Sequence, residues 1–193
     1  MAKRTVTLER KTNETDITVE LCLDGGPYEN HTGIGFFDHM LDHVARHGRF
    51  GLKLSAIGDT HIDDHHTVED VGIVLGQALE QALGDKAGIE RYGFASAPMD
   101  EALARVSVDL AGRAALVFNA TFHTRKIGTF DTQLVHEFLN ALTANGKFAC
   151  HVEVPHGDND HHVAEAIFKA LGRALRTAVS ITGTDVPSTK GSL

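Results

Sequence analysis

The chain has few of the features that mark secreted, membrane or nucleic-acid-binding proteins. Its 193 residues include only two cysteines, Cys22 and Cys150, so we expect no disulfide framework and a cytoplasmic protein with reduced thiols. No apolar run approaches the roughly 20 residues of a membrane span, and the N-terminal residues lack the pattern of a signal peptide. A formal net charge of −8 argues against a nucleic acid as partner, although a local basic pocket can still bind an anionic small substrate.

Histidine, by contrast, is abundant, with 13 residues, and four of them belong to a repeated pattern. Asp64-His65-His66-Thr67-Val68-Glu69 recurs near the C-terminus as Asp160-His161-His162-Val163-Ala164-Glu165. Each copy opens a segment whose apolar residues have helical spacing. On a helix both histidines of a copy can approach its glutamate. The two imidazoles project about 100° apart, so each can serve one of two adjacent sites.

A single copy of this pattern has two interpretations. It is typical of a solvated helix start, with Asp64 as N-cap and an acid in the first turns. The second copy, at the same helical phase, favours a metal site, because imidazole and carboxylate at helical spacing suit Mn, Fe, Co, Ni or Zn. The set contains no thiolate, which argues against a structural zinc site.

The order of the predicted elements also repeats along the chain. Hydrophobic patterning predicts, in the first half, a hairpin at 4–24, a helix from Asp38 to Gly48, a strand at 52–57 and the first His-His helix. Asp38 is the expected N-cap of its helix, and Gly48 is the expected residue that ends it. After a linker at 89–93 and a turn at 98–103, it predicts strands at 106–110 and 114–122, a helix at 132–144, a strand at 147–154 and the second His-His helix. We therefore expect an α+β fold of two half-domains, residues 1–93 and 94–193, that form one catalytic unit.

The helix predicted at 38–48 carries His39, His43 and His47 on one face. A solvated face is one interpretation, and a metal ligand is the other. His39 is the favoured ligand because it is nearest to the helix start. The repeat aligns His39 with Glu137, which follows His136, so one of these two is expected as the ligand of the second half. Two sites of four protein ligands each would leave octahedral ions with positions for substrate.

With these residues in view, the chain closely resembles the imidazoleglycerol-phosphate dehydratase family of histidine biosynthesis, from about Arg4 to Leu193. The segments that carry the resemblance are Asn13-Glu14-Thr15, Gly35-Phe36-Phe37-Asp38-His39-Met40-Leu41, the stretch from Gly58 to Asp70, Pro98-Met99-Asp100-Glu101-Ala102, Asp160-His161-His162 and the stretch from Pro187 to Gly191. The resemblance implies a hydro-lyase with ribosomal-protein-S5-domain-2-like half-domains, each a mixed sheet packed with helices. It also implies a homo-oligomer, a 24-subunit shell with shared active sites, in the cytoplasm.

The resemblance further implies a ligand set for two Mn²⁺ ions per active site, with other divalent transition metals possible. One ion would bind His65, Glu69, His161 and Glu137, with His136 as the alternative to Glu137. The other ion would bind His39, His66, His162 and Glu165. We favour Glu137 over His136 because a carboxylate can replace an imidazole at manganese.

The remaining implied site residues bind or transform the substrate. Glu14, whose position alone predicts an ordinary turn residue, matches the acid/base glutamate of the family. The implied substrate-binding residues are Glu14, Arg91, Arg113, Lys169, Ser188, Thr189 and Lys190. The resemblance assigns the phosphate contacts among them to Arg91, Arg113, Lys169, Ser188 and Lys190. The expected reaction converts D-erythro-imidazoleglycerol phosphate to imidazoleacetol phosphate, with Glu14 moving the proton at C2.

Two other functions fit a histidine-rich metal site. A dinuclear metallohydrolase, such as a phosphatase, would favour more carboxylate ligands and a bridging carboxylate. A metal-storage shell would not need Arg113 or the stretch from Pro187 to Gly191. Release of inorganic phosphate would distinguish the first of these from a dehydratase, and the second would show no activity that chelation removes.

Overall fold

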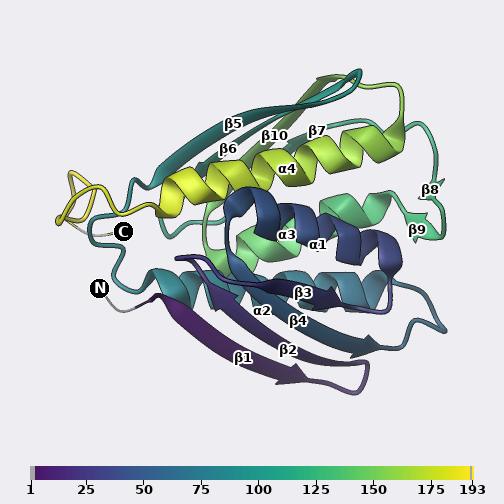
Figure 1. Cartoon of the computed structure of the whole chain (residues 1–193), viewed down its shortest axis with the longest axis horizontal. Helices are drawn as coiled ribbons and strands as arrows, with labels where there is room; N and C mark the ends of the chain where they lie inside the picture. Colours follow the sequence, from purple (N-terminus) through teal and green to yellow (C-terminus); the bar gives the residue numbers. More distant parts are fainter. Residues whose placement is uncertain (1–2, 192) are drawn as a thin grey trace.

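Two four-stranded sheets enclose four helices in the computed structural model, which describes residues 3–191 and 193 (Figure 1). The elements of the first half are β1 (Thr5–Lys11), β2 (Thr15–Cys22), β3 (Tyr28–His31), α1 (Gly35–Gly48), β4 (Gly51–Gly58) and α2 (His65–Leu83). Those of the second half are β5 (Tyr92–Met99), β6 (Ala102–Asp109), β7 (Ala115–Asn119), β8 (Lys126–Ile127), β9 (Phe130–Asp131), α3 (Gln133–Gly146), β10 (Ala149–His156) and α4 (Asp160–Val179).

The two sheets have the same topology, which confirms the expected tandem α+β duplication. Their strand orders are β1-β2-β4-β3 and β5-β6-β10-β7. In each sheet the first three strands are antiparallel, and the last strand pairs in parallel with its neighbour. The short β8–β9 pair of the second half has no counterpart among the described residues of the first half. The expected boundary between residues 93 and 94 lies within β5, which begins at Tyr92.

Each half packs its first helix against the second helix of the other half: α1 lies against α4, and α2 lies against α3. Glycines permit the close approach. A Cβ at Gly172 would lie 2.6 Å from the carbonyl oxygen of Val44 and 3.0 Å from the nitrogen of Gly48. In the other pair, a Cβ at Gly76 would lie 2.8 Å from the nitrogen of Gly146. The buried residues form one continuous core across both halves.

The ends of α1 differ from the sequence prediction. The helix begins at Gly35, and Asp38 is not its N-cap. Instead, the Asp38 carboxylate accepts hydrogen bonds from the backbone nitrogen and hydroxyl of Thr32, at 2.7 and 2.5 Å, which tie the preceding loop to the helix. At the other end the left-handed residue is Arg49, with φ of 55°. Gly48 still lies within the helix, where a Cβ would meet the ring of Phe50 at 2.4 Å.

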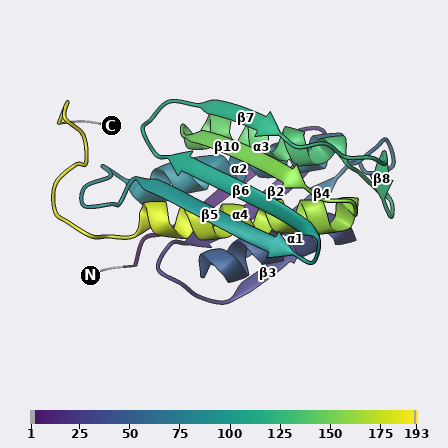
Figure 2. The same ribbon diagram turned by 90° about the horizontal axis from the view of Figure 1, so that it is seen from above.

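Strands β3, β5, β8 and β9 were missed, and the turn predicted at 98–103 is shorter than expected, since only Asp100 and Glu101 lie between β5 and β6. Strand β5 continues through Pro98, which pairs in register with Leu103. Proline is tolerated there because β5 is an edge strand (Figure 2). Its buried residues are small, Gly93, Ala95 and Ala97, because α4 lies close to the sheet: a Cβ at Gly93 would lie 1.9 Å from the oxygen of Ala174. Such a strand lacks the large alternating side chains that reveal strands in a sequence.

Both cysteines are buried and unpaired. Among the residues that the structure describes, no helix is long and apolar enough to cross a membrane.

Candidate functional site

The four helices all begin at the end of the molecule where β8 and β9 lie, whereas both chain termini lie at the opposite end (Figure 1). The metal-ligand candidates belong to these helix starts. They occupy the first two turns of all four helices. The fold therefore gathers at one end the imidazoles and carboxylates that are far apart in the sequence.

Glu165 is the centre of one group, formed by α1 and α4. Its carboxylate is buried and lies 3.1 Å from Nε2 of His39 and 3.0 Å from Nε2 of His161. Lys169 donates a hydrogen bond of 2.5 Å to its other oxygen. Burial alone would raise the pKa of Glu165, but the hydrogen bonds from Lys169, His39 and His161 outweigh it and hold the pKa well below its usual range. Glu165 is thus an ionised acceptor surrounded by nitrogen donors.

His43 joins this group, although the sequence analysis favoured only His39 on that helix face. Its Nε2 lies 3.2 Å from Nε2 of His39 and 3.3 Å from Glu165. Burial lowers the pKa of His43 to about 4, so its imidazole is neutral at neutral pH. One ligand atom from each of His39, His43 and Glu165 lies within 4.8 Å of the other two. The four-residue spacing of these histidines was the available signal.

The start of α2 carries a second group. Nε2 of His65 and Oε2 of Glu69 lie 3.7 Å apart, as expected for neighbours on one helix face. His66 lies on another side of the helix, where its Nδ1 is 3.0 Å from Asp59 and 3.9 Å from Oε2 of Glu14. The hydrogen bond to Asp59 raises the pKa of His66. Glu14, in the turn between β1 and β2, is anchored by a bond from the Asp59 backbone nitrogen to its carbonyl oxygen.

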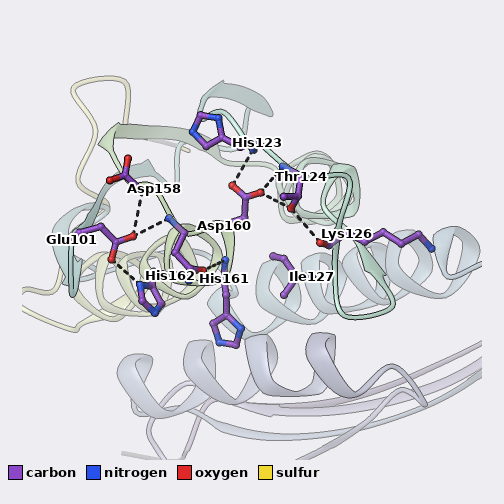
Figure 3. Close-up of a pocket in the computed structure, with 10 residues that line it drawn as sticks. Glu101, His123, Thr124, Lys126, Ile127, Asp158, Asp160, His161 and His162 are labelled. Atoms are coloured by element: carbon purple, nitrogen blue, oxygen red, sulfur yellow. Dashed lines mark hydrogen bonds and ion pairs between the residues drawn. The ribbon is translucent and has the colours of Figure 1, made fainter.

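His162 has the equivalent arrangement in the second half. Its Nδ1 lies 2.8 Å from Oε2 of Glu101, and this bond raises the pKa of His162. Figure 3 shows His161 and His162 projecting in different directions from the start of α4. When neutral, an imidazole that donates from Nδ1 to a carboxylate has its Nε2 lone pair free for a metal. Asp59 and Glu101 were both missed as site residues by the sequence analysis.

A hollow of about 530 Å³ adjoins the start of α4 (Figure 3). Its lining includes Glu101, His161 and His162 together with the loop at 123–127. Asp160 fixes this loop, because its carboxylate accepts hydrogen bonds from the backbone nitrogens of His123 and Thr124 and from the Thr124 hydroxyl.

His136 and Glu137, the two alternatives for the remaining ligand, lie 3.3 Å apart in the first turn of α3. The His136 ring also contacts Phe118 edge-on, with ring centroids 5.4 Å apart. Within residues 3–191, no hydrogen bond or ion pair joins either of them to His65, Glu69 or His161. The choice between them stays a prediction.

The expected phosphate-binding residues do not gather at the histidine end. Arg91 pairs with Asp109 at 2.7 Å and donates to the carbonyl oxygen of Pro187 at 2.8 Å. Its backbone nitrogen bonds to Ala178, near the C-terminal end of α4. The described tail residues Ser188, Thr189 and Lys190 therefore lie at that end, and Gly112, which precedes exposed Arg113, lies against Leu193. Only Lys169 belongs to the histidine end.

Comparisons with known proteins agree with one another. A family model described as imidazoleglycerol-phosphate dehydratase matches residues 32–175. Two relatives are each 56% identical to this chain over 98% of its length. They are the imidazoleglycerol-phosphate dehydratase of Ruegeria pomeroyi, which is covered over 100% of its own length, and that of Rhodopseudomonas palustris strain TIE-1, which is covered over 98%. A crystal structure of the dehydratase from Staphylococcus aureus matches with a TM-score of 0.85 and 42% identity, covering 92% of this chain and 99% of that one. The structure from Pyrococcus furiosus in complex with (S)-C348 has a TM-score of 0.83 and 36% identity, covering 96% of this chain and 100% of that one.

Proposed function

The chain belongs to the imidazoleglycerol-phosphate dehydratase family and is a hydro-lyase of histidine biosynthesis, and we propose that its dehydration of D-erythro-imidazoleglycerol phosphate to imidazoleacetol phosphate depends on two divalent metal ions. The expected ions are Mn²⁺, with other divalent transition metals as alternatives. The observation that carries the proposal is the side-by-side position of Glu14 and His66, whose Oε2 and Nδ1 atoms lie 3.9 Å apart. This places an acid/base candidate beside a metal-ligand candidate.

The donor set fits such ions. His39 and ionised Glu165, which belong to one proposed set, already lie 3.1 Å apart, and neutral His43, which is in neither set, lies beside them. His66 and His162 are each held by a carboxylate at Nδ1, which leaves Nε2 as the ligand atom. All these donors are nitrogen or oxygen atoms, the types that manganese prefers over thiolate. When bound, the ions would stabilise the negative charge that develops on the imidazole ring and on the leaving hydroxyl.

The chain's own residues would position the substrate and move its proton. Glu14 is more than half exposed, with 55% of its side-chain surface accessible, and is free to take the proton at C2 of the glycerol chain within hydrogen-bond reach. Lys190, Ser188 and Thr189 would bind the phosphate, together with Arg91 and Arg113, through charge-assisted hydrogen bonds. Holding the phosphate fixes the distance of C2 from Glu14, so binding contributes to the rate through orientation.

The complete site requires more than one chain. Helix α4 has 20 residues, and a rise of about 1.5 Å per residue separates its ends by about 30 Å. His161 and His162 lie at one end and Arg91 with the tail lies at the other, so a small substrate cannot contact both sets in one chain. The proposed 24-subunit shell would bring the phosphate-binding end of one subunit to the histidine end of another.

Shared sites also account for the scattered ligands. Each proposed ion draws on both halves: His65, Glu69, His161 and Glu137 for one, and His39, His66, His162 and Glu165 for the other. Among the residues that the structure describes, His66 and His162 pair with carboxylates of their own half. A neighbouring subunit that supplied one of these helix starts would complete both sets.

The first test is dehydration with and without metal. Stripped enzyme should be inactive and should recover with Mn²⁺, while the substrate's phosphate stays esterified. Full activity after complete removal of metal would contradict metal dependence. Release of inorganic phosphate in the same assay would favour the metallohydrolase, and metal binding without turnover would favour the storage shell.

Subunit complementation tests the shared site. His162→Ala removes a ligand, and Lys190→Ala removes a phosphate contact at the opposite end of the chain. Each variant alone should be nearly inactive, and co-assembly of the two should restore part of the activity, because some sites then combine intact ends. Absence of recovery in mixed assemblies, verified by differently sized tags, would place each site within one chain.

A further inference from the structure

A hollow of about 470 Å³ lies away from the histidine end, between the C-terminal parts of α1 and α4 and the edge strand β5. Four arginines line it: Arg46 and Arg49 from the end of α1, and Arg173 and Arg176 from α4. Its remaining lining is His47, Phe94, Ala95, Ser96 and Thr177. A pocket of this size falls in the range of small-molecule sites, and no carboxylate lines it.

The four guanidinium groups have no acidic partner. No ion pair among the described residues involves any of them, and their one side-chain hydrogen bond is a long one, 3.5 Å, from Arg46 to the Tyr28 hydroxyl. Three arginines are paired: Arg4 with Asp24 at 2.6 Å, Arg10 with Asp70 at 3.2 Å and Arg91 with Asp109 at 2.7 Å. Arg105, Arg113 and Arg125 have no ion pair among the described residues, but they do not line the hollow. In a chain of net charge −8, four unpaired arginines around one hollow are a concentration of positive charge.

The local electrostatics agree with this. Burial lowers the pKa of Arg176, and the neighbouring charges of Arg49 and Arg173 lower it further. Burial also lowers the pKa of His47, and Lys169, Arg173 and Arg46 add to the effect. Basic residues at the ends of α1 and α4 are favourable for the helix dipoles, but that effect does not require four of them to face one hollow. The smaller contributions to each shift, from the neighbouring cations, have the sign that a bound anion would oppose.

We propose that this hollow binds a small molecule through a diphosphate group. Phosphate groups carry about −1.5 to −2 charges each when singly esterified, so a diphosphate matches several guanidiniums better than a single carboxylate or phosphate does. Arginine forks bind phosphate oxygens in a bidentate manner. The exposed hydroxyl of Ser96 adds a further donor to the lining, whereas that of Thr177 donates to the carbonyl oxygen of Arg173 at 3.3 Å.

The diphosphate has two possible sources, inorganic pyrophosphate or a nucleotide. Phe94 bears on this question, because 61% of its surface is exposed although it lines the hollow. An exposed aromatic face can stack on a base. A nucleoside diphosphate would use this contact, whereas inorganic pyrophosphate would not.

The hollow is distinct from the proposed catalytic site. Along α4, Arg173 is about 18 Å from His161 at a rise of about 1.5 Å per residue. None of the residues expected to bind metal or substrate lines the hollow. The expected phosphate-binding end is nearer, because Arg91 bonds to Ala178, which follows Thr177 of the lining. A Lys190→Ala variant therefore has to distinguish the two.

The test is calorimetric titration of the assembled, full-length protein with pyrophosphate, ADP and inorganic phosphate. The test variant is Arg49→Gln/Arg176→Gln. The matched control is Lys53→Gln/Lys147→Gln, which removes two positive charges from side chains that are 51% and 59% exposed elsewhere. Pyrophosphate should bind the wild type and the control alike, and should bind the arginine variant at least about tenfold more weakly, since hydrogen bonds to charged groups contribute that much or more.

Further measurements distinguish a nucleotide from inorganic pyrophosphate and replace an arginine variant that does not fold. Tighter binding of ADP that Phe94→Ala abolishes would identify a nucleotide, and equal binding of both ligands, insensitive to Phe94→Ala, would identify inorganic pyrophosphate. If thermal unfolding shows that the first arginine variant does not fold, Arg46→Gln/Arg173→Gln, at two exposed positions, takes its place.

Three results would overturn the proposal. They are no binding of either diphosphate at millimolar concentration, equal affinity in the arginine variants, and loss of binding in Lys190→Ala instead, which would assign the ligand to the catalytic phosphate site. A variant that changes the size of the assembly without any diphosphate binding to the wild type would assign the surface to a contact between chains.

Discussion

Oε2 of Glu101 lies 2.8 Å from Nδ1 of His162. The other oxygen of this carboxylate accepts backbone hydrogen bonds from Asp158 and Asn159, at 3.3 and 2.9 Å, just before α4. Hydrogen bonds from His162 and Asn159 lower the pKa of Glu101 to about 2, so it remains an acceptor at neutral pH. One side chain thus fixes both the loop before α4 and the tautomer of a proposed metal ligand.

Glu101→Gln should therefore weaken metal binding while preserving the fold. The amide oxygen can keep the backbone bonds, but the amide nitrogen then faces Nδ1 and favours the tautomer whose Nε2 carries the proton. Metal affinity should fall by about 10- to 100-fold, as for other residues that orient a ligand, which titration of stripped enzyme with Mn²⁺ would measure. Glu20→Gln, at a 47% exposed carboxylate on β2 away from the helix starts, is the control. An unchanged affinity in Glu101→Gln would show that this bond does not orient His162.

Glu14→Gln should abolish turnover but preserve binding. The amide keeps the size of the side chain and loses its ability to take a proton, so kcat should fall by about 10²- to 10⁴-fold. KM and metal content should change little, because Glu14 is not a proposed metal ligand. Glu9→Gln, an exposed position on β1, serves as control and should have normal kinetics. A Glu14→Gln enzyme with near-normal kcat would remove Glu14 from the acid/base role.

Gly172→Ala should destabilise the protein without touching the site. The added Cβ would lie 2.6 Å from the carbonyl oxygen of Val44, so α1 and α4 must separate. Overpacking of this kind costs about 1–3 kcal/mol, and a lower Tm in thermal unfolding would report it. Gly183→Ala, where nothing lies within 4 Å of the added Cβ and φ is not positive, should leave Tm nearly unchanged. Equal Tm values for both variants would contradict the close helix contact.

Asp160 should contribute stability that is lost in acid. Burial alone would raise its pKa, but hydrogen bonds from Thr124 and from the His123 backbone outweigh it and lower the pKa from 3.8. The folded protein therefore binds this proton less readily than the unfolded chain. The contribution is fully present above the unfolded pKa and disappears as pH falls through the lower folded value.

The measurement is the difference in Tm between wild type and Asp160→Asn as a function of pH. It should be largest near neutral pH and should shrink as pH falls below about 4. Asp158→Asn, at an exposed carboxylate nearby, should show no such trend. A difference that stays constant down to pH 2 would mean that the charge of Asp160 does not stabilise the loop.

The duplicated fold could be predicted because its signals are local. Helical spacing and paired histidines identified α2 and α4, and the repeated order of elements gave the two halves. Strand β5 was missed because its inward residues are glycine and alanine. Larger side chains would not fit there, since α4 packs close to this strand. The N-cap of α1 was misplaced because Asp38 bonds to Thr32 in the loop, a contact that spacing alone does not favour over a cap.

The site was only partly predictable for a similar reason. The histidines and glutamates are marked by spacing within one helix, so they could be identified directly. Asp59 and Glu101 act on histidines 7 and 61 positions away in the sequence, and only the folded chain shows these pairs. The arginine hollow combines two helices and a strand, and none of these segments is unusual by itself.

The crosswise pairing of α1 with α4 and of α2 with α3 gives the molecule the form of a homodimer fused into a single polypeptide. The helices of each half bury the apolar helix faces of the other half, and glycines at corresponding contacts allow the close approach. The β8–β9 pair belongs to the second half, and its buried Phe130 packs against Phe37 of α1 in the first half. The side chains that carry the chemistry can therefore differ between the two halves while the helix packing between them stays symmetric.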